Sequence, residues 1–499
     1  MFAHVLAIVG SIASGPNPHA LVDSALAAVR ARAAPARVES VRLTGVDHTW
    51  LLGNAERADG PWRVSYAQFS ELYDPVNGSL RRTALTLPAD ANNTSERVTI
   101  LTDSVAGLFD GGRFIVGSHS TYEDLVDRVD GLPLRALELA SASSRLVYDR
   151  AVRRYGVPHD VVSFPWRNGR MRLELNRETH LPDAVEIVRT YPDNFRWAAF
   201  GDVTMRTDNV DWTVTPSGAY WPMQQKISLN GEPLRDVTYS AAVLDGSPVA
   251  RDSFAFSDSA RAEYAAGSAL NFSRLRVGMR GKPVELERGI VRIPDFWAQT
   301  LVKQPDGVVI FEAHISAQYL HDVIGEANRR WPGSPIKALV MTSDPWAHIG
   351  GVREAMALGI PIYVRATSIP FLTRLAAAPH TLDPDSLARS RRAPRFVSVS
   401  GRTVIGSGAN RIVLYPVRGP YAERMVMAYF PGHHLLYGAD LVFRNRGPNG
   451  EPQPGFFETE ATDLRRAVAR EHLVVDTLIC VQNTPPVAWR EFDESRATP

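Results

Sequence analysis

The stretch from Met341 to Gly351, MTSDPWAHIGG, decides how the second half of the chain is interpreted. It follows the apolar run KALVMT and precedes VREAMALG, whose apolar spacing is typical of a helix. A polar turn between a strand and a helix is where α/β proteins place functional side chains. Ser343, Asp344 and His348 lie in this turn and are therefore candidate functional residues.

The sequence on both sides of this turn alternates between strand and helix patterns. GIVRIPDFWAQTLVKQPDGVVIFEA predicts two or three strands, and a helix is expected over Ala317 to Arg330. Further strands are predicted at IPIYV, RIVLYPV, RMVMAYF, HLLYGADLV and VVDTLICV, with a helix from Glu460 to Glu471. The hydrophobic period alternates between about 2 and 3.6, which predicts layered sheets covered by helices.

The first half of the chain has a different pattern. Aromatic and β-branched runs are broken by turn residues, and Asn230-Gly231 is a strong hairpin signal. Consecutive hairpins predict a curved antiparallel sheet. Helical patterns are seen at Ala20 to Ala34, around Val105 to Phe109, and at Leu134 to Arg154.

The change of pattern predicts a boundary near residues 274 to 284. The fold class is α+β, with an antiparallel β-rich domain at residues 20–278, a few helices on it, and an αβ/βα domain at residues 279–499. Residues 1–19 form an N-terminal segment that begins MFAHVLAIVGSIASG. It reads either as a weak signal peptide or as a buried strand or frayed terminus. Because no Lys or Arg precedes its apolar run, a cytoplasmic location is favoured over export.

Composition excludes several classes of function. Of 499 residues, 44% are hydrophobic and 22% charged, a profile typical of a globular protein with a full-sized core. Lys plus Arg total 55 and Asp plus Glu total 54, so no global charge favours nucleic acid or an anionic membrane. No apolar run is long enough for a membrane helix. The single cysteine, Cys480, excludes an internal disulfide and lies in an apolar run, as a small core residue would.

Several landmarks together carry a resemblance to a known family. They are GIVRI, VVIFEA, TSDPWAHIGG, YFPGHHLLYGADL and PPVAW, in this order between Lys282 and Trp489. This half resembles the metallo-β-lactamase superfamily, whose αβ/βα sandwich holds ligands for two metal ions on loops at one edge. The hairpin order of the first half is similar to the half-barrel of outer-membrane lipoprotein carriers.

The resemblance implies a metal motif of which only part is present in the turn. The family pattern Thr-His-x-His-x-Asp-His-x-Gly-Gly has histidines where this chain has Ser343 and Pro345, and an aspartate where it has Ala347. His348 matches the pattern, as does the Gly350-Gly351 pair.

Three further ligand positions lie later in the chain. Tyr421 stands where the family has a histidine, and the bridging aspartate is kept as Asp440. Asn483 stands in place of the last histidine, with Gln482 as the alternative if the loop is shifted by one residue. Because so many nitrogen donors are replaced, we expect no dinuclear zinc centre.

Two interpretations of the remaining residues stay open. His348 and Asp440 form a metal-free hydrogen-bonded pair, or they join Asp344 in binding one divalent zinc, iron or manganese ion. Glu423 is close enough in sequence to join these catalytic candidates with Tyr421. No further cofactor is expected.

Other residues are candidates for binding a substrate. Trp346 is expected to form a wall or lid of a pocket, and His314 is close to the same edge; Gln482 and Asn483 complete the set. Ser343 is assigned a structural or binding hydroxyl, because the sequence places no evident base beside it.

Three functions follow. The chain is a divergent enzyme, hydrolase-like or lyase-like, that acts on a small organic substrate by acid and base chemistry at this edge. Alternatively, it is a non-catalytic protein that binds an apolar or lipid-like ligand. The third hypothesis, a standard metallohydrolase with misaligned ligands, is the weakest because no His-x-His spacing occurs in the chain.

Overall fold

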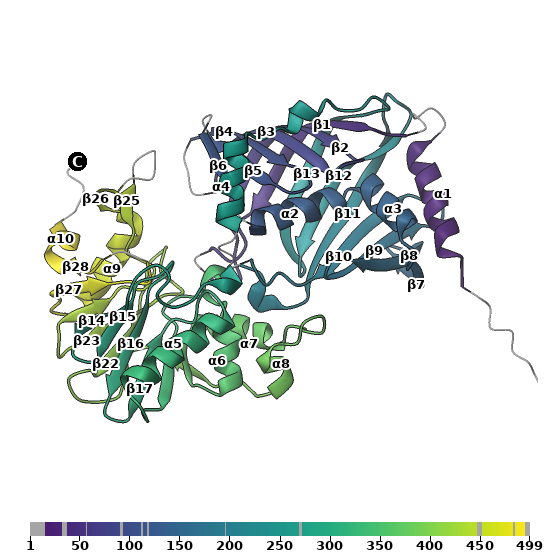
Figure 1. Cartoon of the computed structure of the whole chain (residues 1–499). Coiled ribbons are helices and arrows are strands. Elements are labelled where there is room, and N and C mark those ends of the chain that lie inside the picture. The colour runs from purple at the N-terminus through teal and green to yellow at the C-terminus, as the bar shows by residue number, and fades with distance from the viewer. Residues whose placement is uncertain are drawn as a thin grey trace, which may run out of the picture.

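The computed structural model describes residues 15–31, 37–55, 57–89, 93–110, 113–116, 119–194, 196–268, 272–446, 452–482 and 485–494. Residues 1–14 of the signal-like segment therefore lie outside the described residues. Figure 1 shows two bodies of chain, one built on strands β1 to β13 and the other on strands β14 to β28.

Thirteen strands of the N-terminal half form one sheet in the order β6-β5-β4-β3-β2-β1-β13-β12-β11-β10-β9-β8-β7. Neighbouring strands are antiparallel, as the hairpin pattern predicted, and Asn230 and Gly231 form the β12–β13 turn with φ of 50° and 87°. The strands are β1 Ser40–Trp50, β2 Val64–Asp74, β3 Ser79–Leu87, β4 Ser95–Leu101, β5 Ala106–Asp110, β6 Arg113–Val116, β7 Val147–Arg154, β8 Val157–Trp166, β9 Gly169–Asn176, β10 Pro182–Arg189, β11 Val203–Val214, β12 Tyr220–Leu229 and β13 Glu232–Asp245.

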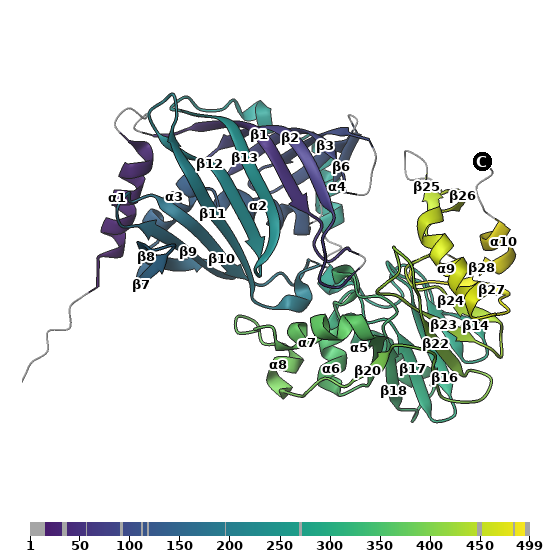
Figure 2. The same ribbon diagram turned by 180° about the vertical axis from the view of Figure 1, so that it is seen from behind.

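Helices cover one face of this curved sheet. Figures 1 and 2, taken together, place α2 and α3 on the same side of strands β10 to β13. Leu134 and Leu137 of α3 pack into the core with Val185 and Ile187 of β10, whose alternating pattern turns these residues inward. The helices are α1 Pro18–Arg30, α2 His119–Asp130, α3 Pro133–Ala142 and α4 Asp258–Ser268.

Two helix predictions in this half were wrong. The segment Val105 to Phe109 is a strand, since β5 pairs with β4 and β6, and a five-residue apolar run cannot distinguish the two structures. The helix predicted over Leu134 to Arg154 ends at Ala142, where Ser143 is already extended. The remainder is β7, the edge strand, which pairs with β8.

The C-terminal half contains a seven-stranded sheet and a six-stranded sheet. Strands β17 to β20 are parallel in the first sheet, and antiparallel strands continue it on the β14 side. The strands are β14 Val284–Glu287, β15 Ile290–Ile293, β16 Gln299–Gln304, β17 Gly307–Phe311, β18 Ile336–Val340, β19 Ile362–Arg365 and β20 Phe396–Val399, then β21 Thr403–Ile405, β22 Ile412–Pro416, β23 Val426–Phe430, β24 Leu435–Tyr437, β27 Thr477–Ile479 and β28 Val487–Ala488. Strands β25 Arg444–Arg446 and β26 Pro452–Phe456 form a separate hairpin.

The two sheets of this half face each other across an apolar core. The Phe311 ring of β17 lies 5.9 Å from that of Phe430 and 4.9 Å from that of Tyr437, measured between centroids. Helices α5 to α8 lie outside the first sheet, and α9 lies on the second (Figure 1). The predicted αβ/βα sandwich in an α+β chain is thereby confirmed. The helices are α5 Ala317–Arg330, α6 Val352–Leu358, α7 Ile369–Ala377, α8 Ser386–Ser390, α9 Glu458–Arg470 and α10 Trp489–Glu494.

The two halves have separate sheets. Strand β13 ends at Asp245 and β14 begins at Val284, and in the described part of the chain no ladder joins the two sets of strands. The division of the chain into two independent domains between residues 278 and 279 stays a prediction. Within the described residues, no helix is long and apolar enough to cross a membrane.

Candidate functional site

The turn after β18 is held against the loop between β17 and α5. A short 3-10 helix, Trp346–His348, follows Pro345, and α6 begins at Val352. A Cβ on Gly350 would lie 2.4 Å from the Ile315 carbonyl oxygen, so a side chain cannot be accommodated there. The close approach of the two loops requires this glycine.

The turn brings Ser343 and His348 together. Ser343 Oγ lies 3.0 Å from His348 Nδ1, and both residues are buried. Asp440 Oδ2 lies 3.9 Å from the same ring nitrogen, and Asp440 accepts a hydrogen bond from Gln482 Nε2. Four predicted site residues therefore form one group, and the expectation that Ser343 has no base beside it was wrong.

Burial controls the protonation of His348. It lowers the pKa of the imidazole, an effect that the nearby Asp440 carboxylate opposes and the Arg424 guanidinium reinforces. The imidazole is therefore neutral near neutral pH, and its Nδ1 can accept a proton from the Ser343 hydroxyl.

Asp344 faces a different partner. Its Oδ1 is bound by Arg424 Nε, and the side chains of this ion pair are 0% and 1% exposed. Sequence reasoning missed Arg424, although a basic residue at the start of the apolar run RMVMAYF was a visible signal. The carboxylate that was expected to serve as acid, base or metal ligand is thus engaged with a buried cation.

Tyr421 and Glu423 lie at the surface of this edge. Glu423 is paired with Arg57 Nε at 2.8 Å, and its side chain is 42% exposed. Tyr421 is 36% exposed, and its backbone N–H donates to Asp463. Tyr421 lines the same cavity as Asp440, whereas the contacts of Glu423 direct it to Arg57.

A buried layer lies behind His348. The Trp297 ring is 5.1 Å from His348 and 5.8 Å from His314, between centroids. Burial, and secondarily the nearby His348, holds the pKa of His314 well below its usual range. Burial also raises the pKa of Glu312 to about 8, although Thr342 donates hydrogen bonds to its carboxylate.

Trp346 joins the two halves of the chain. Its backbone N–H donates to the Gly53 carbonyl at 3.2 Å, and a Cβ on Gly53 would lie 2.2 Å from Trp346 Cγ. Its ring is buried in an aromatic cluster formed with Trp62, Trp197, Phe200 and Phe371. The residue expected as a pocket wall or lid is therefore a contact between halves.

A cavity of about 710 Å³ adjoins the Ser343–His348–Asp440 group. Its wall is mixed: Asp440 and Tyr421 bring polar groups to it, and Met425, Phe443 and Phe457 bring apolar ones. The remaining lining residues are Asn54, Ala55, Arg63, Ala89, Pro345, Arg424, Thr459 and Glu460. Asn483, predicted to bind substrate, lies outside the described residues.

The residues at this edge do not fit a metal ion. Throughout the described residues, no group of three His, Cys, Asp or Glu side chains is placed to hold one. The single-ion set of Asp344, His348 and Asp440 has lost Asp344 to the ion pair with Arg424. Ser343 and Pro345 supply no nitrogen donor, and Ala347 supplies no carboxylate, at the positions where the family motif implies them.

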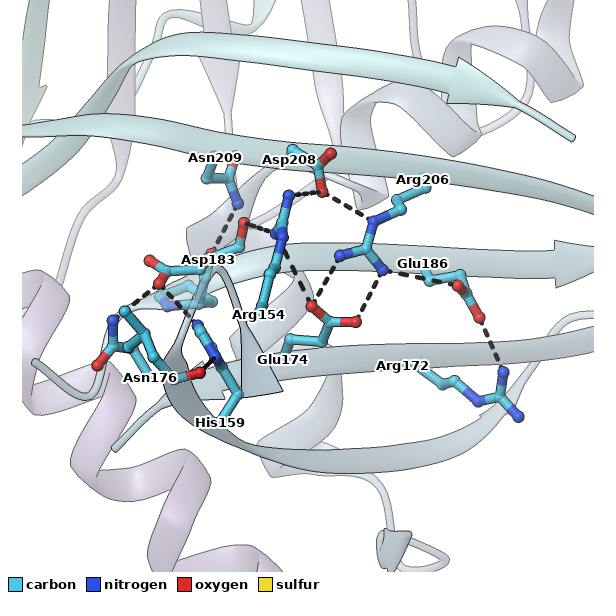
Figure 3. Close-up of polar contacts among 12 residues, drawn as sticks. Arg154, His159, Arg172, Glu174, Asn176, Asp183, Glu186, Arg206, Asp208 and Asn209 are labelled. Carbon is cyan, nitrogen blue, oxygen red and sulfur yellow. Dashed lines mark hydrogen bonds and ion pairs between the residues drawn. The ribbon is translucent and has the colours of Figure 1, made fainter. Parts of the chain in front are cut away.

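A larger cavity, of about 1110 Å³, lies in the N-terminal half beside α1. At its polar corner the Asp183 carboxylate accepts from Asn176 Nδ2 at 2.8 Å and lies 2.9 Å from His159 Nε2 (Figure 3). It also accepts from Trp212 Nε1 at 3.1 Å. Much of the remaining wall is apolar and includes Ala27, Ala28, Ala31, Val157, Leu181, Val210, Val214 and Tyr220. Sequence analysis assigned no site to this region.

Paired charges continue from this corner across the sheet. Arg206 donates to both oxygens of Glu174 at 2.7 Å, and Arg154 lies 2.7 Å from Asp208 (Figure 3). Because each of these charges has an opposite neighbour, the row stabilises the sheet face with no large local field.

Comparison with known proteins finds similarity to solved structures of the metallo-β-lactamase fold. The inverting sec-alkylsulfatase Pisa1 from a Pseudomonas species shares 15% identity over 44% of this chain, with a TM-score of 0.32. A metallo-β-lactamase from Pontibacter korlensis shares 14% identity over 43% of this chain and 96% of its own, with a TM-score of 0.31. For one from Erythrobacter litoralis, the identity is 13%, the coverage 43% and 93%, and the TM-score 0.32.

These similarities have clear limits of extent. The match spans about 41% of the alkylsulfatase. No family model matches the chain, and no curated protein matches it. The chain is therefore similar, over somewhat less than half its length, to metallo-β-lactamase-fold structures.

Proposed function

We propose that the chain is a metal-independent, hydrolase-like enzyme that acts on a small carboxylic ester. The observation that carries the proposal is the 3.0 Å contact between Ser343 Oγ and His348 Nδ1, beside the Asp440 carboxylate. An alcohol is a weak nucleophile until a neighbouring base takes its proton. A neutral, buried imidazole at hydrogen-bond distance supplies that base.

The reaction assigned to these residues has two stages. Ser343 Oγ bonds to the substrate carbonyl carbon while its proton passes to His348 Nδ1, and that proton then leaves with the alcohol as the ester bond breaks. Water next attacks the acylated Ser343, giving one proton to His348, which returns it to Ser343 Oγ as the acid departs. The Asp440 carboxylate, 3.9 Å from Nδ1, stabilises the imidazolium that forms in each stage.

The nearby cavity supports the class of substrate. It holds about 710 Å³, and its wall combines apolar side chains, such as Met425 and Phe443, with polar ones. Asp440 belongs both to this wall and to the group around His348. Ser343 and His348 are buried behind the wall, so the reaction requires the ester carbonyl to reach Ser343 past Asp440.

A fluorophosphonate probe tests the proposal because it reacts with activated serines. We expect the probe to label Ser343, identified by peptide mass spectrometry, and the Ser343→Ala variant to lose this label. Turnover of p-nitrophenyl acetate and butyrate should fall by about 10²–10⁴-fold in His348→Ala and less in Asp440→Asn. Ser257→Ala, in an exposed helix-capping turn, is the matched control. Absence of label at Ser343, or unchanged turnover in Ser343→Ala, contradicts the proposal.

A second candidate function is the binding of an apolar ligand in the N-terminal half. The observation in its favour is the cavity of about 1110 Å³, with alanines of α1 and aliphatic strand residues in its wall. An apolar molecule that leaves water for such a wall gains about 25 cal/mol for each Å² buried.

Native mass spectrometry of freshly purified protein and titration with cis-parinaric acid test this candidate. Ala28→Trp fills the cavity from α1 and should reduce affinity at least tenfold, whereas His19→Trp, at an exposed position more than two turns earlier in the same helix, should not. Equal affinity in Ala28→Trp and the unsubstituted chain would place the ligand elsewhere.

A further inference from the structure

We propose that the Arg424 guanidinium is a built-in cation, which balances the negative charge of this edge in place of a metal ion and anchors the connection between β1 and β2. This inference does not depend on the proposed reaction, because it concerns charge balance and stability. It starts from the finding that the residues of the edge do not fit a metal.

The first observation is the burial of the ion pair. Arg424 and Asp344 are 2% and 0% exposed, and their side chains are in direct contact. Removing two ions from water costs several kcal/mol each unless they compensate one another at short range. Each group therefore requires the other, and the loss of one leaves an uncompensated charge in the interior.

The second observation is the position of the guanidinium. Arg424 lies two residues before the start of β23, and its Nε reaches Asp344 in the turn after β18. Ser343, Asp344 and His348 belong to one short turn, and Asp440 lies beside His348 from the other sheet. The guanidinium thus places a fixed positive charge against the Asp344 carboxylate, at the edge whose residues do not fit a metal ion.

The third observation is a contact with the other half of the chain. Arg424 Nη1 donates to the Ala55 carbonyl oxygen at 2.6 Å. Ala55 belongs to the β1–β2 connection, residues 51–63, in which Glu56 lies outside the described residues. Backbone carbonyl and carboxylate oxygens are the donors that a hard cation attracts, and here a guanidinium collects both.

Neighbouring contacts hold the same connection. Gly53 accepts from the Trp346 N–H at 3.2 Å, and Arg57 pairs with Glu423 at 2.8 Å on the surface. Asp59 is paired with Arg374 of α7. Of the charged residues in this set, Arg424 is the buried one, so its loss should release the connection more than the loss of Arg57.

A double-mutant cycle tests the charge balance. We expect Arg424→Met to lower Tm by roughly 5 °C or more, and Asp344→Asn to lower it similarly, because each leaves a buried ion alone. Arg424→Met combined with Asp344→Asn should be more stable than either single variant. Arg57→Met, which removes an exposed ion pair, is the control and should change Tm by about 1 °C or less.

Chemical rescue shows whether the loss of stability in an Arg424 variant comes from the missing positive charge or from the missing side-chain packing. Methylguanidinium at about 10 mM should raise the Tm of Arg424→Ala and leave that of the unsubstituted protein unchanged. Trypsin should cleave after Arg57 about tenfold faster in Arg424→Met if the connection is released.

Two results overturn the inference. One is a double variant whose Tm falls by the sum of the two single losses. The other is an Arg424→Met protein with unchanged Tm and unchanged cleavage after Arg57. If Arg424→Met yields no folded protein, the Tm values of Asp344→Asn and the double variant still test the inference. The inference requires the double variant to have the higher Tm.

Discussion

At the scale of single residues, Glu312 is a buried acid whose ionisation opposes folding. Burial raises its pKa to about 8 from 4.5, while Thr342 donates hydrogen bonds to it. Because the folded state holds the proton more tightly, the stability that protonated Glu312 contributes is present below about pH 4.5. It is lost as pH rises through about 8.

Glu312→Gln should remove this dependence, because the amide matches the protonated acid and cannot ionise. Urea denaturation at pH 5, 6, 7, 8 and 9 measures the free energy of unfolding of both proteins. We expect the variant to gain on the unsubstituted chain by up to about 1.4 kcal/mol per pH unit, until the difference levels off near pH 8. A difference that does not change with pH would show that Glu312 is ionised in the folded state throughout.

Position 53 requires glycine because of a residue in the other half of the chain, Trp346. Its φ is +76°, and a Cβ would lie 2.2 Å from Trp346 Cγ, whereas Gly231 has a φ of +87° with nothing within 4 Å of a Cβ. Gly231→Ala therefore measures backbone strain alone, of about 1 kcal/mol. Gly53→Ala adds displacement of the Trp346 ring and should cost at least about 2 kcal/mol more in urea denaturation. Equal losses in the two variants would mean that the ring moves freely.

Among the residues of the candidate site, some were predictable from the sequence and others were not. His348 and Asp440 were predicted from the resemblance to a family motif, and the structure places them at one edge. Arg424 was missed because a single basic residue before a strand is ordinarily solvated surface, and only packing reveals that it is buried against Asp344. A catalytic role for His348 and Asp440 stays a prediction.

At the scale of elements, long periodic segments were predictable and short ones were not. The helix predicted over Ala317 to Arg330 has those bounds in the structure, since four turns of regular apolar spacing leave little ambiguity. The five residues Val105 to Phe109 carry too few periods, and pairing with β4 and β6 decides their conformation. The end of α3 at Ala142 depends on tertiary pairing of β7, which local sequence does not encode.

At the scale of the whole molecule, the aromatic cluster around Trp346 predicts that the halves associate when the chain is divided. Co-expressed fragments 1–278 and 279–499 should co-elute in size-exclusion chromatography, because Trp62, Trp197 and Phe200 pack on Trp346. Trp346→Ala should weaken the association at least tenfold. Tyr155→Ala, which removes an exposed aromatic ring in the β7–β8 turn of the N-terminal half, is the control. Fragments that elute separately without any substitution would contradict the prediction.

The fit between Gly53 and the Trp346 ring has a consequence for the evolutionary history of the chain. The Trp346 indole occupies the space that a side chain at Gly53 would need, and Arg424 donates to a backbone carbonyl of the same connection. The shape of each half therefore depends on the shape of the other. Exchange of either half by recombination would bring together surfaces that had not been selected as a pair. We therefore expect the two halves to have been inherited together, with compensating substitutions on both sides of the interface between them.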